Sequence, residues 1–328
     1  MLALAALLAG CASHSPHASA RRREASARSF AGRPATASTA TGAATTSAAT
    51  PQHAASRPQP PFAVGEITLT LTDSSRSVTF PGQPPQPRRL VTFVRYPLAR
   101  GRFPLVVFGH GFAVTPGIYA RLLQAWARAG FVVAAPVFPL ANADAPGGPN
   151  EADLVNQPRD MSFVIGRLLA LSAGRHTPFT LRADEIAVAG QSDGGDTALT
   201  VAYDSRFRDR RIRAAVILSG QEIPGLGGYD FPAGSPPLLA TQGLADTINP
   251  PATTFAFWQA ARPPKYLLTL PGAPHLGPYT DQQPQLGAVE RVTIAFLDRY
   301  LRGQPARLAR LVAAGGVPGV AVLRADGG

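Results

Sequence analysis

The feature that most constrains this chain is the run GQSDGG at residues 190–195, a G-x-S-x-G-G pattern that directly follows EIAVA at residues 185–189, a stretch that is apolar after its first residue. Alone, G-x-S-x-G is a weak pattern in a chain with 32 glycines. Between a strand and a helix, it is typical of a nucleophile elbow, a sharp turn that exposes a serine hydroxyl at the edge of a sheet. We therefore predict that Ser192 is a nucleophile.

Composition limits the classes of protein that fit. With 328 residues, 45% of them hydrophobic, the chain can bury the core of one large α/β domain and carry an appendage. The formal net charge is +11, but residues 1–61 hold six Arg and one Glu, so nearly half of the excess lies outside the expected fold. Beyond them we find no basic run interleaved with aromatic residues, and we predict no nucleic-acid partner.

The N-terminal residues indicate export. Residues 1–10 are apolar, too short to span a bilayer, and end at Cys11, the one cysteine of the chain. The segment LAGC at residues 8–11 resembles the lipobox of bacterial lipoproteins, which implies a signal peptide over 1–10 and a lipid such as palmitate on Cys11. We expect an extracytoplasmic protein anchored to the cell membrane by that lipid. An accidental cysteine in an ordinary N-terminus is the alternative.

A single cysteine also has structural consequences. It permits no intramolecular disulfide and no zinc cluster built from thiolates. Residues 11–61 consist mostly of Ala, Ser, Thr and Pro, which offer too little bulky apolar surface to offset the entropy of ordering, so we predict a disordered tether. The catalytic domain is expected over 62–303, and residues 304–328 are expected to be a C-terminal tail to which we assign no role.

Within 62–303 the apolar periodicity predicts an α/β fold. Residues 67–71 and 90–94 alternate as half-buried strands do and should begin the sheet as antiparallel strands. Short apolar runs suited to buried parallel strands then alternate with helical patterns. The expected strands are 105–108, 131–135, 185–189, 214–218, 238–241 and 266–270, and the expected helices lie at 119–129, around 161–169 and at 286–301.

A serine nucleophile needs a general base and an orienting carboxylate. Three of the six histidines precede residue 54, His176 lies in a loop flanked by Gly and Pro, and His110 precedes the elbow, where we expect it to hold its loop. His275 follows the last predicted strand and is our predicted base. In this arrangement the chain order is Ser, acid, His, and Asp246 fits between the other two.

Two other carboxylates are alternatives for the acid. Asp281 comes after His275 in the chain, and Glu222 belongs to the loop of the preceding strand, so both fit the required order or position less well. A triad of this kind requires neither a cofactor nor a metal.

The oxyanion formed during acyl transfer needs hydrogen-bond donors. The run FGHGF at residues 108–112 ends a predicted strand, and its H-G-x form resembles the first oxyanion element of lipases and esterases. That resemblance implies the backbone amide of Phe112 as one donor. The second expected donor is the amide of Asp193, the residue after the nucleophile, at the positive end of the elbow helix.

Together these motifs resemble the α/β-hydrolase superfamily, in the branch of dienelactone-hydrolase-like proteins, chlorophyllase, platelet-activating-factor acetylhydrolase and cutinase-like polyester hydrolases. The resemblance covers about residues 62–303 and rests on residues 108–112, 190–195, 243–246 and His275. It implies the α/β-hydrolase fold: a mostly parallel central sheet with helices on both faces and antiparallel N-terminal strands. Many relatives have His where this chain has Gln191, a position outside the triad.

The substrate prediction rests on loop length. Lipases and many esterases insert a cap after the strand ending near Gly220, whereas here about sixteen residues reach the next strand, so we expect no large cap domain and an open cleft walled by residues 140–157. We predict a monomeric carboxylesterase for short- to medium-chain or polymeric esters. Alternatives are a catalytically silent envelope binding protein, and a lipase, cutinase-like enzyme or amide hydrolase with the same triad.

Overall fold

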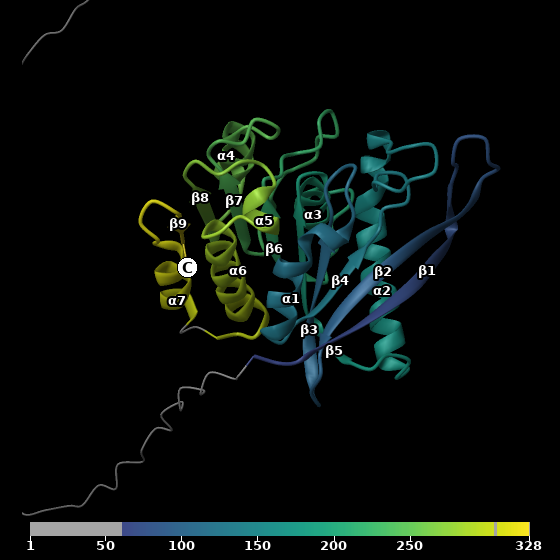
Figure 1. The fold of residues 1–328 in the computed structure, drawn as a ribbon, viewed down its shortest axis with the longest axis horizontal. Helices are drawn as coiled ribbons and strands as arrows, with labels where there is room; N and C mark the ends of the chain where they lie inside the picture. The colour runs from purple at the N-terminus through teal and green to yellow at the C-terminus, as the bar shows by residue number, and fades with distance from the viewer. Residues whose placement is uncertain (1–60, 305–306, 328) are drawn as a thin grey trace, which may run out of the picture. The chain divides into compact units, whose positions relative to one another are not determined.

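The central element of the fold is a sheet of nine strands in the order β1-β2-β4-β3-β5-β6-β7-β8-β9 (Figure 1). The computed structural model describes residues 61–304 and 307–327. The predicted signal peptide, Cys11 and the tether up to residue 60 lie outside the described residues. No helix in the described ranges has both the length and the apolar character needed to cross a membrane.

The strand directions confirm a mostly parallel sheet with antiparallel N-terminal strands. Neighbours are parallel from β4 across to β8, whereas β1, β2 and β9 run antiparallel to the strands beside them. The strands are β1 (Val64–Val78), β2 (Gln86–Pro97), β3 (Arg102–Gly109), β4 (Val132–Pro136), β5 (Thr180–Gln191), β6 (Ile212–Leu218), β7 (Leu238–Gly243), β8 (Lys265–Leu270) and β9 (Val322–Asp326).

Burial explains why these segments are strands. Every residue of β4 and of β7 is buried, as expected for parallel strands covered on both faces, and apart from Gln242 their residues are apolar or small. The outermost strand β1 instead alternates between exposed positions and half-buried or buried ones over much of its length. That alternation matches a strand with one face in solvent.

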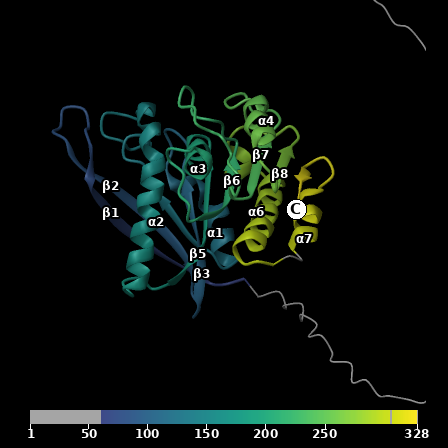
Figure 2. The same cartoon turned by 180° about the vertical axis from the view of Figure 1, so that it is seen from behind.

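Helices cover both faces of the sheet (Figures 1 and 2). Buried side chains of α1 and α6 belong to one apolar core, and those of α2, α3 and α4 to the core on the opposite face. The helices are η1 (Pro116–Tyr119), α1 (Ala120–Arg128), η2 (Glu151–Asn156), α2 (Gln157–Ala173), α3 (Asp193–Tyr203), α4 (Pro251–Ala260), α5 (Gly277–Thr280), α6 (Gln285–Leu301) and α7 (Arg307–Gly315). This is the α/β-hydrolase fold.

The segment expected as a C-terminal tail is built into this fold. Helix α7 contributes the fully buried Leu311 to the core that it shares with α6, and β9 pairs antiparallel with β8 from Lys265↔Asp326 to Thr269↔Val322. The last strand of the sheet therefore comes from residues that the sequence pattern placed outside the domain.

Candidate active site

Ser192 occupies the turn between the end of β5 and the start of α3. Its backbone has φ 55° and ψ −128°, a region that residues with side chains populate rarely and at a cost of about 1–3 kcal/mol. Two backbone hydrogen bonds hold it there: its amide donates to Leu218 of β6 at 3.0 Å, and its carbonyl accepts from the Asp196 amide at 2.9 Å. The strained turn places the hydroxyl beyond the carboxyl end of β5, where the residue is 9% exposed.

The glycines of the motif allow α3 to lie directly against the sheet. A Cβ atom at position 190 would collide with the carbonyl of Gly194, and one at position 194 would collide with the carbonyl of Gly109 in β3. Any side chain at Gly190 or Gly194 would therefore push the helix away and displace Ser192.

Three side chains from three separate segments form one chain of hydrogen bonds. His275 Nε2 lies 2.9 Å from Ser192 Oγ, and His275 Nδ1 lies 2.7 Å from Asp246 Oδ2. Asp246 follows β7 and His275 follows β8, so the parallel strands bring both to the sheet edge at which β5 ends. Because the Asp246 carboxylate only accepts hydrogen bonds, Nδ1 carries the ring proton, and Nε2 is free to accept from the serine hydroxyl.

The buried Asp246 carboxylate is kept ionised by its surroundings. Oδ1 accepts from the amides of Ile248 at 2.9 Å and Asn249 at 3.0 Å, and Oδ2 also accepts from Gln242 Nε2 at 3.2 Å. Burial raises the pKa of Asp246, but the hydrogen bond and charge of His275 and the two amides outweigh it and hold the pKa below its usual value. The Asp246 carboxylate therefore accepts the hydrogen bond of His275 Nδ1 as a charged group.

The structure does not join the alternative residues to His275. Asp281 accepts from the Thr280 hydroxyl at 3.2 Å, and Glu222 lies exposed in the loop after β6. The carboxylate that reaches His275 is that of Asp246.

His110 is buried and serves its own loop. Its Nδ1 lies 2.8 Å from the Gly111 carbonyl, and its Nε2 accepts from the Phe138 amide at 3.0 Å. Burial lowers the pKa of His110 to about 4, although the bond to Gly111 opposes that shift. A neutral imidazole therefore ties the loop after β3 to the segment after β4, in line with the structural role expected from the sequence.

The two predicted oxyanion donors lie close to Ser192. Asp193 follows Ser192 directly, and the backbone before Phe112 packs on Ser192, since a Cβ atom at Gly111 would lie 3.3 Å from Ser192 Cβ. Within the described ranges, neither the Phe112 nor the Asp193 amide has an acceptor. Both N–H groups are available to a ligand.

The Asp193 side chain lies buried beside this site. Only 7% of the residue is exposed, and its Oδ2 has no hydrogen-bond partner within the described part of the chain. Burial raises the pKa of Asp193 to about 6, the charge of Glu151 adds to the rise, and His275 opposes it. At neutral pH the site therefore holds a poorly solvated carboxylate.

We expect Asp193→Asn to raise the free energy of unfolding at pH 8 by about 2–3 kcal/mol and to leave it almost unchanged at pH 3. The folded pKa of about 6 lies above the ordinary value of 3.8, so this carboxyl costs no stability where it is protonated in both states, costs more as the pH rises from 3.8 to 6, and costs a constant amount above that. Urea unfolding at the two pH values measures the difference. An equal gain at both would contradict this account of Asp193.

The surroundings of Ser192 carry no cap between β6 and β7. Residues 219–237, all within the described part, contain no helix. Exposed apolar side chains occur on loops at this sheet edge: Leu244 and Ile248, 44% and 68% exposed, flank Asp246, and Ile118 of η1 shares a surface hollow with Leu276. The described residues contain no group of three or more His, Cys, Asp or Glu that could hold a metal ion.

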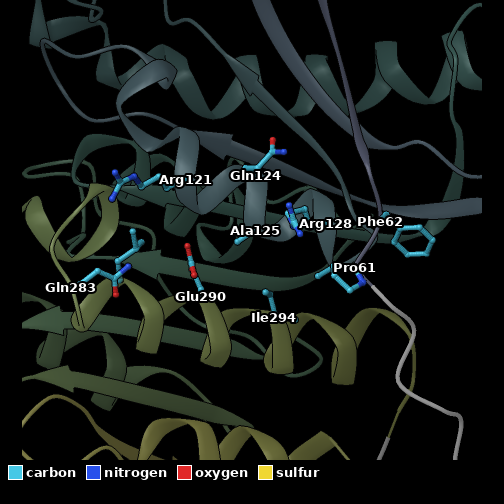
Figure 3. Close-up of a pocket in the computed structure, with 11 residues that line it drawn as sticks. Pro61, Phe62, Arg121, Gln124, Ala125, Arg128, Gln283, Glu290 and Ile294 are labelled. Carbon is cyan, nitrogen blue, oxygen red and sulfur yellow. The ribbon is translucent and has the colours of Figure 1, made fainter.

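A separate groove lies between α1 and α6 (Figure 3). None of Ser192, Asp246 and His275 lines it. Its lining residues are Pro61, Phe62, Arg121, Gln124, Ala125, Arg128, Ala129, Gln283, Leu286, Glu290 and Ile294.

Comparison with known proteins agrees with the fold and the elbow. Residues 60–219 match the family model of chlorophyllase. Chlorophyllase-2 of Arabidopsis thaliana is 26% identical over 179 residues, which cover 52% of this chain and 52% of that protein. The chain thus spans about half the length of the curated relative it matches.

The chlorophyllase match includes Ser192 and Phe112 and ends before Asp246 and His275. The chain has the α/β-hydrolase fold and is similar to chlorophyllases in its matched part.

One polar residue of the site was not anticipated. Gln191 was placed outside the triad by sequence, yet its Nε2 lies 3.1 Å from the His275 carbonyl oxygen. Its position directly before Ser192 was the available signal of a role in the site, but no local pattern indicated where the Gln191 amide would point.

Proposed function

We propose that this protein is a serine carboxylesterase in which Ser192 is the nucleophile, His275 the general base and Asp246 the residue that orients the imidazole. The observation that carries the proposal is the unbroken hydrogen-bonded chain from Asp246 Oδ2 through His275 to Ser192 Oγ, at 2.7 and 2.9 Å. The strained elbow beneath Ser192 and the match to the chlorophyllase family model support it.

Acylation is the first half of the proposed reaction. Ser192 Oγ attacks the ester carbonyl carbon while its proton passes to His275 Nε2, and Asp246 stabilises the imidazolium. The carbonyl oxygen becomes an oxyanion that accepts from the Phe112 and Asp193 amides, and one such donor is typically worth about 3 kcal/mol. The C–O bond to the alcohol then breaks, and His275 gives its proton to the departing oxygen.

Deacylation repeats these steps with water. His275 takes a proton from a water molecule that attacks the acyl carbon, the oxyanion forms again between the same amides, and the bond to Ser192 Oγ breaks as His275 returns the proton. The products are a carboxylic acid and free enzyme, and no cofactor enters the balance.

For the substrate, we infer apolar esters of short or medium acyl chain, including polymeric ones. The absence of a helix in residues 219–237 leaves the approach to Ser192 uncapped, and the exposed Leu244 and Ile248 give it apolar surface. The buried carboxylate of Asp193 disfavours an anionic acyl group.

A chain-length series of p-nitrophenyl esters tests both statements. We expect kcat/KM to be at least about tenfold higher for the butyrate than for the palmitate, because a site without a cap has no cover to enclose a long chain. A higher value for the long-chain ester would contradict the substrate assignment. Failure to hydrolyse any ester of the series would favour a silent binding protein instead.

A further inference from the structure

Gln191 is a buried polar residue that the triad mechanism does not use. It is the last residue of β5, 1% exposed, and pairs with Leu218 of β6, so its backbone is fixed at the carboxyl end of the central strand. Its Nε2 donates to the His275 carbonyl at 3.1 Å and lies 3.2 Å from His275 Nε2. The amide group therefore contacts both the backbone and the ring of His275.

The oxygen of the Gln191 amide is linked through Tyr119 to the oxyanion loop, which is the segment after β3 that carries the Phe112 amide. Tyr119, fully buried, accepts from the Gly111 amide at 3.2 Å and donates its hydroxyl proton to Gln191 Oε1 at 2.7 Å. Burial raises the pKa of Tyr119 far above its usual value, so the hydroxyl keeps its proton as a donor.

These partners determine the orientation of the amide. The Tyr119 hydroxyl accepts from the Gly111 N–H and so directs its own proton to Gln191 Oε1. The His275 carbonyl is purely an acceptor, so it requires the NH₂ group of Gln191 on its side. In this orientation every hydrogen bond of the network pairs one donor with one acceptor.

The network also lies next to Ser192. A Cβ atom at Gly111 would be 3.0 Å from Gln191 Oε1, 3.2 Å from the Tyr119 hydroxyl and 3.3 Å from Ser192 Cβ. The loop that carries Phe112, Ser192 and the Gln191 amide thus converge on one point beside Gly111, where no side chain would fit.

We propose that Gln191 is a positioning residue: it links the loop that carries His275 to the loop that carries the Phe112 amide, through Tyr119, and anchors both to the centre of the sheet. This inference rests on the proposed esterase function. The imidazole and the oxyanion donor must keep one mutual geometry while charge moves between Ser192, His275 and the carbonyl oxygen, and a displacement of about 1 Å at such a site can cost about 100-fold in rate.

The test replaces the amide by groups of similar size. Gln191→Met removes both hydrogen-bonding edges, and Gln191→Glu keeps an acceptor for Tyr119 but turns an oxygen toward the His275 carbonyl. We expect both variants to lower kcat for p-nitrophenyl butyrate by about 10- to 100-fold with KM within about threefold of wild type. Tyr119→Phe, which leaves Gln191 in place, should lower kcat by a smaller factor.

Two controls separate positioning from folding. Gln124→Met makes the same replacement on α1, in the groove of Figure 3, and should keep wild-type kcat. Circular dichroism measures the folded fraction of each variant. A KM change with intact kcat, or wild-type kinetics in Gln191→Met, would overturn the proposal.

A second measurement needs no turnover and so separates this inference from the esterase function. In Gln191→Met, hydrogen exchange measured by mass spectrometry should become several-fold faster in peptides covering 271–276 and 110–113, with 212–218 unchanged. If wild type hydrolyses no ester, the esterase proposal fails while these exchange rates still report on the network. Unchanged exchange in both loops would overturn the link itself.

Discussion

Replacing Ser192 with alanine should lower kcat for p-nitrophenyl butyrate by a factor of about 10⁴ or more and leave the fold intact. Loss of the nucleophile removes the acyl-enzyme pathway, and the residual rate then comes from binding and the oxyanion donors alone. Alanine can keep the backbone geometry of the elbow, because no hydrogen bond that holds the turn uses the serine side chain. Steady-state kinetics and the thermal midpoint together measure the effect.

A matched serine provides the control for that experiment. Ser205 lies exposed just after α3, and its hydroxyl makes one long hydrogen bond, 3.4 Å, to the Gly228 carbonyl. Ser205→Ala should keep wild-type kcat. Residual activity of Ser192→Ala above about 1% of wild type would contradict the assignment of Ser192 as nucleophile.

The largest expected effect on stability belongs to Arg88 of β2. We expect Arg88→Met to lower the free energy of unfolding by about 3–5 kcal/mol. Arg88 is 2% exposed, and its guanidinium bonds to Asp153 at 2.6 and 2.9 Å and to Asp160 at 2.7 Å through each of two nitrogens. Its removal leaves two buried carboxylates, and only Asp160 keeps another cation, Arg76 at 2.7 Å. Chemical denaturation measures the loss.

Arg95 on the same strand is the control for Arg88. It pairs with Glu66 at 2.8 Å, but Glu66 is 58% exposed, so solvent screens the pair. Arg95→Met should therefore cost at most about 1 kcal/mol. Equal losses in the free energy of unfolding for the two variants would contradict the expectation that the buried ion pairs of Arg88 matter more to stability than the exposed pair of Arg95.

Most of the fold could be predicted from the spacing of apolar residues along the sequence. The buried parallel strands β3, β6 and β7 appear in the sequence as short apolar runs because both of their faces are covered. Strand β9 has no such signal, since it lies at the sheet edge and four of its five residues are exposed. Only its pairing with β8, some sixty residues earlier in the chain, makes it a strand.

Chain order selected Ser192, Asp246 and His275 as candidates, because each was expected beyond the end of a strand, and the structure joins the three by hydrogen bonds. The polar contacts around them were not predictable in the same way. Gln191 meets Tyr119, which is 72 residues away in the chain, and Arg88 meets Asp160, also 72 residues away. A local pattern places such residues on an element but says nothing of their partners across the fold.

The central claim, that Ser192 is an activated nucleophile, is tested most directly by a fluorophosphonate. Serine hydrolases react with such a probe through the nucleophilic oxygen, so intact-protein mass spectrometry of wild type should show one covalent adduct, and peptide mapping should locate it on Ser192. Ser192→Ala should remain unlabelled under the same conditions. An unlabelled wild type, or equal labelling of Ser192→Ala, would contradict the account.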